Sequence, residues 1–169
     1  MGSRARVLNV DNVSLKKTNK GLKINSAYLT LSSDIAMHFR VKKSDFDNAG
    51  YKDPKLAVEF NSIKTTLRPV EETINGNSYY VFRYDDLYPK MMKDEFVATL
   101  TAKLNGVSCT SNTIRYSISQ YLYNMLSSNT DAYSRKMFVD MLNYGTAAQA
   151  YNNYNLKNLA TSELASSQS

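Results

Sequence analysis

Tyrosine is the residue type whose abundance in this chain most clearly suggests recognition chemistry. The sequence contains 13 tyrosines and 6 phenylalanines but no tryptophan. A tyrosine ring offers rigid contact area with a polar hydroxyl at its tip, which suits the recognition of proteins or sugars. The candidate partner-binding residues are exposed tyrosines and two neighbouring basic residues: Tyr88, Tyr123, Tyr133, Arg135, Lys136 and Tyr144. The alternative is that these tyrosines rim a helix–sheet interface and leave only their hydroxyls in water.

Histidine and paired carboxylates, the usual acid–base groups, form no recognisable catalytic pattern. His38 is the only histidine, and it falls on the polar side of an alternating strand, IAMHFRV (35–41), where we expect a surface or rim position. A Ser-His-Asp relay would need this histidine, and the chain has no GxSxG motif. Adjacent acidic residues on a strand point to opposite sides and do not converge on one substrate. Such pairs are Glu71 with Glu72 and Asp85 with Asp86. The sequence therefore predicts a protein that is not an enzyme.

One polar segment has part of the acidic spacing of a calcium-binding loop. Asp45, Asp47 and Gly50 match the first, third and sixth positions of such a loop. The twelfth position is Leu56 instead of a bidentate glutamate, so the segment is not an EF-hand. A looser calcium site that uses Asp45, Asp47 and Asp53 is one interpretation, and an Asx-rich turn before a strand is the other. No cofactor is expected.

Charge, cysteine content and hydropathy exclude several classes of partner. The net charge is +6, and the excess of basic residues lies in residues 1–116, where they are scattered without forming an arginine-rich helix or a nucleic-acid-binding motif. We expect solvated strand faces, or a patch that meets an acidic partner, and no binding to nucleic acid. The single cysteine, Cys109, cannot form an intramolecular disulfide, and no apolar run approaches the length of a membrane span.

Residues 7–116 have the alternation and turn spacing of an antiparallel β-sandwich. Short strands recur about every ten residues, and many are separated by turn residues such as Asn61-Ser62, Asn75-Gly76 and Asn105-Gly106. Between the strands, residues 44–54 and 86–94 are expected to be loops. The expected strands cover residues 7–10, 13–17, 22–31, 35–41, 56–60, 63–67, 79–84, 95–104, 107–110 and 113–117.

Residues 117–155 predict a two-helix hairpin that packs on this sandwich. The second helix begins at Asp131, whose carboxylate is suited to capping the first turn. Gly145 inside the helix favours close approach to another backbone, such as a sheet. The expected inward face contains Phe138, Met141, Leu142, Gly145, Ala148 and Tyr151, and the expected outward residues are Arg135, Lys136, Asn143 and Tyr144. Residues 1–6 are typical of an expression-tag remnant, and residues 156–169 are expected to be a disordered tail or a linker.

Four stretches carry a resemblance to a known kind of domain: SSDIAMHFRV, NSYYVFRYDDLYPKMMKDEFVATL, ISQYLYNML and VDMLNYGTAAQAYNNYN. Over residues 27–165 the chain resembles a domain of large secreted or cell-surface proteins of gut Clostridia, of the kind found in Lachnospiraceae and Ruminococcus. The resemblance implies an Ig-like antiparallel β-sandwich capped by a C-terminal two-helix hairpin, with adhesion or ligand capture as its role. No catalytic residue is transferred by it.

The expected function is a non-catalytic binding or adhesion module of a bacterial cell-surface protein. The partner implied by the resemblance is a host or environmental protein, such as a host glycoprotein or an immunoglobulin. A carbohydrate-binding module and a structural spacer are the alternatives, and the absence of tryptophan speaks against the carbohydrate. The module is expected to be secreted or displayed on the bacterial surface, without inserting into a membrane.

Overall fold

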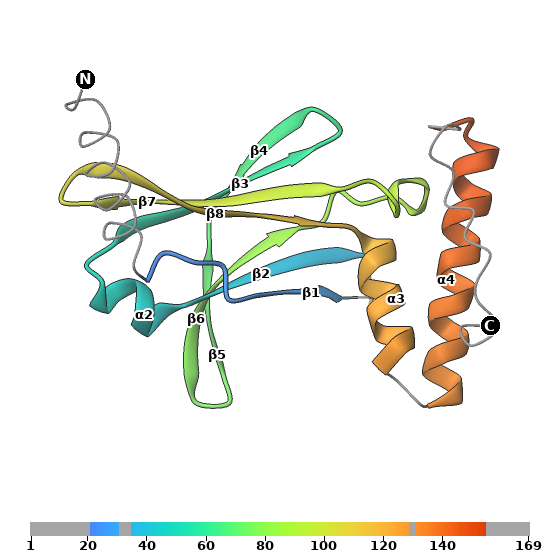
Figure 1. Cartoon of the computed structure of the whole chain (residues 1–169), viewed down its shortest axis with the longest axis horizontal. Helices are drawn as coiled ribbons and strands as arrows, with labels where there is room; N and C mark the ends of the chain where they lie inside the picture. Colours follow the sequence, from blue (N-terminus) through green and yellow to red (C-terminus); the bar gives the residue numbers. More distant parts are fainter. Residues whose placement is uncertain (1–20, 31–34, 129–130, 155–169) are drawn as a thin grey trace, which may run out of the picture.

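The computed structural model describes residues 21–30, 35–128 and 131–154 and shows a mainly β protein with C-terminal helices. Two four-stranded antiparallel sheets have the strand orders β1-β2-β6-β5 and β4-β3-β7-β8. Helices α3 and α4 stand together at one end of the strands (Figure 1). The predicted antiparallel β-sandwich with a C-terminal helical hairpin is confirmed.

The elements follow one another with short connections. The strands are β1 (Ser26–Thr30), β2 (Ala36–Lys42), β3 (Lys52–Phe60), β4 (Ile63–Leu67), β5 (Val70–Ile74), β6 (Asn77–Tyr84), β7 (Phe96–Leu104) and β8 (Val107–Tyr116). The helices are α2 (Lys43–Asn48), the 3-10 turn η1 (Pro89–Met91), α3 (Ile118–Ser128) and α4 (Ala132–Tyr151). Among the described residues, no helix is long and apolar enough to cross a membrane.

Three hairpins form where the turn residues predict them. Positive φ angles of 48° at Asn61 and 65° at Ser62 close β3 onto β4. The Asn75-Gly76 and Asn105-Gly106 turns, which also have positive φ at both residues, join β5 to β6 and β7 to β8. A two-residue turn with positive φ at both positions matches the right-handed twist of the flanking strands. Asparagine and glycine adopt positive φ at the lowest energetic cost.

Alternating side chains from both sheets form one core. Phe60 stacks on Phe96 at 4.5 Å between ring centroids within one sheet. Tyr84, from the other sheet, contacts both rings edge-on at 6.2 and 5.7 Å. These contacts join the inner faces of the two sheets, as the alternation of apolar residues along the strands requires.

The predicted loop at residues 44–54 is wrong in detail. Its first part is the short helix α2, and its last residues begin β3. Phe46 is fully buried and meets the Tyr80 ring edge-on at 5.3 Å, which draws the segment onto β6. The Lys43 ammonium donates to the Tyr80 hydroxyl at 2.9 Å and to Glu71 at 3.0 Å. A tertiary contact therefore stabilises a helix that its polar sequence does not predict.

The surface position expected for His38 is also wrong. Only 7% of this residue is exposed. Its ring stacks on Tyr28 at 4.7 Å, and Nε2 lies 3.0 Å from the Thr30 hydroxyl. Neighbouring side chains of β1 therefore shield His38 from water, although Arg40 and Lys42 on the same side of β2 stay partly exposed.

Other strand boundaries differ from those expected. Strand β8 is continuous where two strands are predicted, and the strand predicted at residues 22–31 is shorter, because β1 begins at Ser26. Strand β5, which the sequence does not predict, is an edge strand of the β1-β2-β6-β5 sheet. The strands expected at residues 7–10 and 13–17, the tag at 1–6 and the tail at 156–169 lie outside the described residues.

Helix α4 docks on the β6–β7 connection and on α3, a correction to the expected docking on a sheet. The buried residues of α4 are Phe138, Leu142, Gly145 and Gln149, whereas Tyr151, expected to face inward, is 92% exposed. A Cβ atom added to Gly145 would lie 2.6 Å from Met92 Sδ and 3.2 Å from the Pro89 carbonyl oxygen. The glycine does permit close approach to another backbone, but that backbone belongs to η1.

We expect Gly145→Leu to lower the free energy of unfolding by about 2 kcal/mol or more, because overpacking against a fixed carbonyl forces the helix to move. Chemical denaturation measures this change. Ala147→Leu is the matched control, since Ala147 lies on the exposed side of the same helix. Equal losses in the two variants would contradict the close contact between Gly145 and η1.

Candidate functional site

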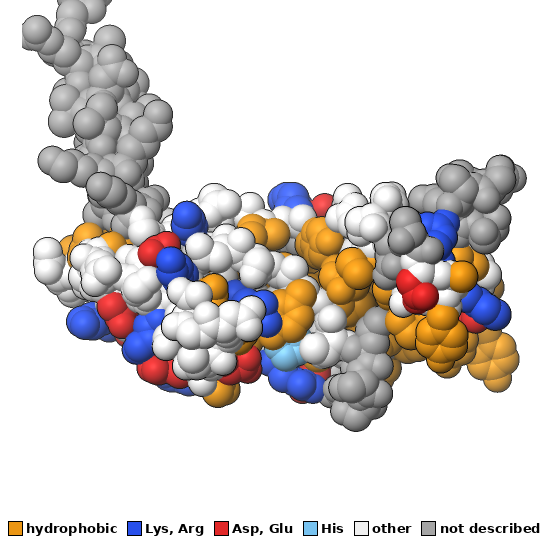
Figure 2. All heavy atoms as spheres, turned by 90° about the horizontal axis from the view of Figure 1, so that it is seen from below, with side chains coloured by type: hydrophobic (Ala, Val, Ile, Leu, Met, Phe, Trp, Pro, Cys, Tyr) orange, Lys and Arg blue, Asp and Glu red, His pale blue; other side chains and the backbone are white. Residues whose placement is uncertain are grey.

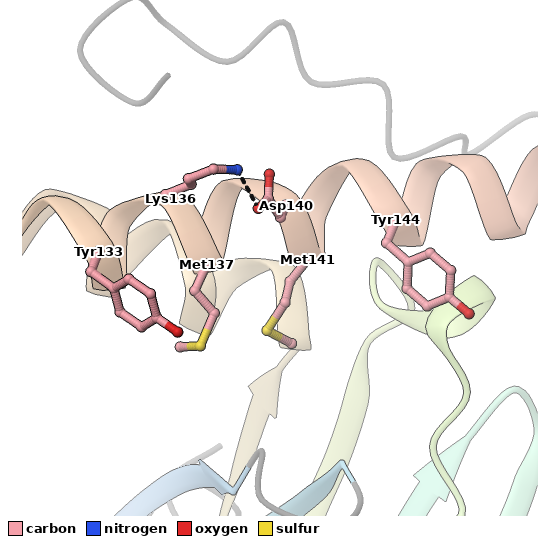
Figure 3. A pocket seen from close by; sticks show the side chains of 6 residues that line it. All are labelled: Tyr133, Lys136, Met137, Asp140, Met141 and Tyr144. Atoms are coloured by element: carbon pink, nitrogen blue, oxygen red, sulfur yellow. Dashed lines mark hydrogen bonds and ion pairs between the residues drawn. The ribbon is translucent and has the colours of Figure 1, made fainter.

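The outer face of α4 carries a groove of about 410 Å³ along the helix. We call the four apolar residues along it the α4 stripe: Tyr133, Met137, Met141 and Tyr144. They recur at steps of four, four and three, so they share one side of the helix. Figure 3 shows their side chains pointing the same way, with Lys136 and Asp140 along one flank.

The stripe is exposed. Relative exposure is 81% for Tyr133, 61% for Tyr144 and 40% for Met137, and Met141 is partly buried. Tyr151, about two turns further along the same side, is also exposed. Figure 2 shows hydrophobic side chains gathered at the end of the molecule where Figure 1 places α4. Aromatic and methionine side chains left in water together mark an interaction surface more strongly than single exposed residues do.

The charged flank is internally paired. Lys136 Nζ lies 2.7 Å from Asp140 Oδ2, one helical turn away, and both side chains are largely exposed. An exposed pair of this kind contributes little to stability. Its two charges can therefore exchange partners at an interface at little cost.

Two local features orient the first half of α4. The Ser134 backbone N–H donates to the Asp131 carboxylate at 2.8 Å, which begins the helix where the sequence predicts it. Hydrogen bonds from the Ser134 hydroxyl and from this N–H hold the pKa of Asp131 below its usual range. Arg135 Nη1 donates to the Leu126 carbonyl in the last turn of α3, so the two helices are joined at their adjacent ends.

The structure separates the residues that the sequence groups as a binding site. Tyr133, Lys136 and Tyr144 come together along the groove. Arg135, expected to point outward, instead turns toward α3. Tyr123 is partly buried against the core, and Tyr88, 55% exposed, lies beside η1.

Sequence reasoning misses Met137 and Asp140 as parts of the site. It assigns Met141 to the inward face, and this residue is partly buried against the core while it also lines the groove. The available signal is the spacing of Met137 and Met141 from Tyr133 and Tyr144, which places all four on one side of a helix.

The acidic residues considered for chemistry are engaged elsewhere. Asp47 lies 3.4 Å from Lys43, and Asp53 lies 3.0 Å from Lys55. Glu71 also pairs with Lys43. Within residues 21–30, 35–128 and 131–154, no group of three or more His, Cys, Asp or Glu side chains is arranged to hold a metal ion. The carboxylates of Asp47 and Asp53 are thus engaged in local ion pairs.

The C-terminal end of α4 is fixed to the sandwich by a polar cluster. The Tyr154 hydroxyl donates to the buried Asp94 carboxylate and accepts from the Asn61 side-chain amide. Lys90 lies over the Tyr154 ring at 5.4 Å. Burial, together with the hydrogen bond to Asp94, raises the pKa of Tyr154 from 10.0 to about 12. The β3–β4 turn and the β6–β7 connection thus both hold the end of this helix.

No family model matches this sequence, and no curated protein matches it. The arrangement of side chains on α4 is therefore the basis for assigning a function.

We expect the Tyr154 cluster to lose its stabilising effect as the pH rises. The folded state favours the neutral phenol, so its contribution is complete below pH 10 and is lost as the pH approaches the folded pKa of about 12. Melting temperatures measured across this range should fall more steeply for the parent protein than for Tyr154→Phe. The matched control is Tyr151→Phe, whose residue is almost fully exposed. Parallel curves for the parent and Tyr154→Phe would contradict the assignment.

Proposed function

We propose that this domain is a non-catalytic binding or adhesion module of a bacterial cell-surface protein, and that it contacts a protein partner through the outer face of α4. The observation that carries the proposal is the exposed α4 stripe, from Tyr133 to Tyr144. It spans about 16 Å along a helix that is held at both ends. A rigid support of this kind lets the stripe bind without first becoming ordered.

The composition of the stripe favours a protein over a sugar. Tyrosine and methionine are enriched in the buried centres of protein interfaces, and methionine adapts its shape to a partner. Sugar recognition needs several free hydrogen-bonding groups around a ring platform. Lys136 and Asp140, the charged groups in the groove, are paired with each other.

The cellular setting follows from the resemblance to clostridial surface domains. On that basis the module is secreted or displayed on the bacterial surface, and a host glycoprotein or an immunoglobulin is the first class of protein partner to test. An adhesion module needs only a stable scaffold and an exposed contact surface, and the sandwich with α4 supplies both. A structural spacer would have no use for an exposed stripe of this composition.

We expect Tyr133→Ala and Tyr144→Ala each to weaken protein binding by about tenfold or more, the loss typical of an aromatic side chain at the centre of an interface. Biolayer interferometry with purified immunoglobulin, mucin glycoproteins and the domain itself as analytes measures this change. Tyr88→Ala is the matched control, because its exposure is close to that of Tyr144 but it lies off the helix.

Two results would count against this proposal. Equal binding by the parent protein and both stripe variants would place the contact elsewhere on the domain. Binding to a glycan array, with no binding to any protein analyte, would favour the carbohydrate-binding alternative.

A further inference from the structure

The α4 stripe has nearly the same pattern in both directions along the helix. Tyrosines stand at its two ends and methionines at the two inner positions. Reversing the helix about a point between residues 138 and 139 exchanges Tyr133 with Tyr144. The same reversal brings Met137 to position 140, one residue from Met141. That residue corresponds to a displacement of about 1.5 Å. A surface with this property can pack against a second copy of itself in antiparallel orientation.

The charged flank adds direction to this pattern. Lys136 and Asp140 lie on the same side of the stripe (Figure 3). In an antiparallel pair, the two-fold axis runs perpendicular to both helices and keeps the two charged flanks on the same side of the interface. Lys136 of each copy then approaches Asp140 of the other, and the four charges alternate in sign. A parallel two-fold pair would place the two charged flanks on opposite sides of the interface, where they gain no such contact.

We propose that the partner of the α4 stripe is a second copy of this chain, bound as an antiparallel, two-fold symmetric pair. This inference rests on the proposed function, because it names the protein that the outer face of α4 binds. Tyr133 of one copy packs against Tyr144 of the other at both ends, and the methionines meet at the centre. The two Lys136–Asp140 pairs within the copies are exchanged for two such pairs between the copies.

The size of the surface sets the strength expected of the pair. Stable complexes bury roughly 800 Å² on each partner, and a stripe of about three helical turns supplies less. The self-association is therefore weak and depends on concentration. On a cell surface, where many copies are held close together, such contacts add through multivalency. The domain would then act in homophilic adhesion, in which copies on the same or on neighbouring cells bind each other.

Charge exchange tests the orientation and the partner together. Sedimentation equilibrium of the full chain should show a monomer–dimer equilibrium. Lys136→Glu alone, or Asp140→Lys alone, should weaken dimerisation by about tenfold or more, because like charges then face each other twice in the symmetric pair. An equimolar mixture of the two single variants should recover a dimer, since opposite charges then face each other at both contacts. The double variant K136E/D140K should recover it as well.

Controls separate this effect from loss of folding. Recovery on mixing requires both single variants to be folded, and their melting temperatures give a second check. Lys64→Glu is the matched control, because it breaks an exposed ion pair of the same kind, with Glu59, on the β3–β4 hairpin. It should leave the dimer unchanged.

The outcomes distinguish this inference from the proposed function. A parent chain that stays monomeric at all concentrations, yet binds immunoglobulin or another protein through Tyr133 and Tyr144, would overturn the inference and leave the function standing. A dimer that is insensitive to both single charge changes would also overturn it. A monomer that binds none of the tested proteins through the stripe would count against both.

Discussion

The close approach of Gly145 to the Pro89 carbonyl is the contact on which the arrangement of the candidate site depends. A helix can turn only one side toward the body of the protein, and the position without a side chain is the one that comes closest. Phe138 and Leu142 are buried on the same side. The rotation of α4 is thereby set, and most of the α4 stripe, beside the buried face, is left in water, with Met141 partly buried. The exposure of the groove that we propose as a binding surface is therefore a consequence of packing on the inner face.

The β6–β7 connection is the joint between the sandwich and the two helices. The Met92 carbonyl accepts a hydrogen bond of 2.9 Å from the Ser119 N–H at the start of α3. Met92 and Pro89 pack closely against Gly145, and the Asp94 carboxylate accepts a hydrogen bond from the Tyr154 hydroxyl. One short segment thus contacts α3, α4 and the residue Tyr154 just after α4. This concentration of contacts explains how α4, which packs mainly on η1 and α3, is held at the end of the sandwich.

The groove on α4 offers shape and apolar area, which the proposed binding would use. Its charged residues, Lys136 and Asp140, are exposed and paired, so they set direction more than affinity. The ion pairs on the sandwich are also between neighbouring surface residues, such as Arg115 with Glu95 at 2.7 Å. Where a basic residue is paired with an acidic neighbour in this way, the two charges offset each other at that part of the surface. The exposed aromatic and methionine residues of α4 remain the feature that distinguishes this surface.

Local chemistry determined much of this protein from its sequence alone. The asparagine-containing turns and the Asp131 cap each act within a few residues, and each is found where the pattern predicts it. Most of the alternating strands are also present, although some of their boundaries differ. The helix α2 depends on contacts with Glu71 and Tyr80, which are far away in the chain. The burial of His38 and the turn of Arg135 toward α3 depend on neighbouring elements, β1 and α3, whose placement a single-segment pattern does not contain. For α4, the sequence contains two apolar stripes with the same helical period. The sequence already places Gly145 on the inward face, but only the tertiary structure decided that this glycine meets η1 instead of a sheet and that Tyr133, Met137, Met141 and Tyr144 line one groove.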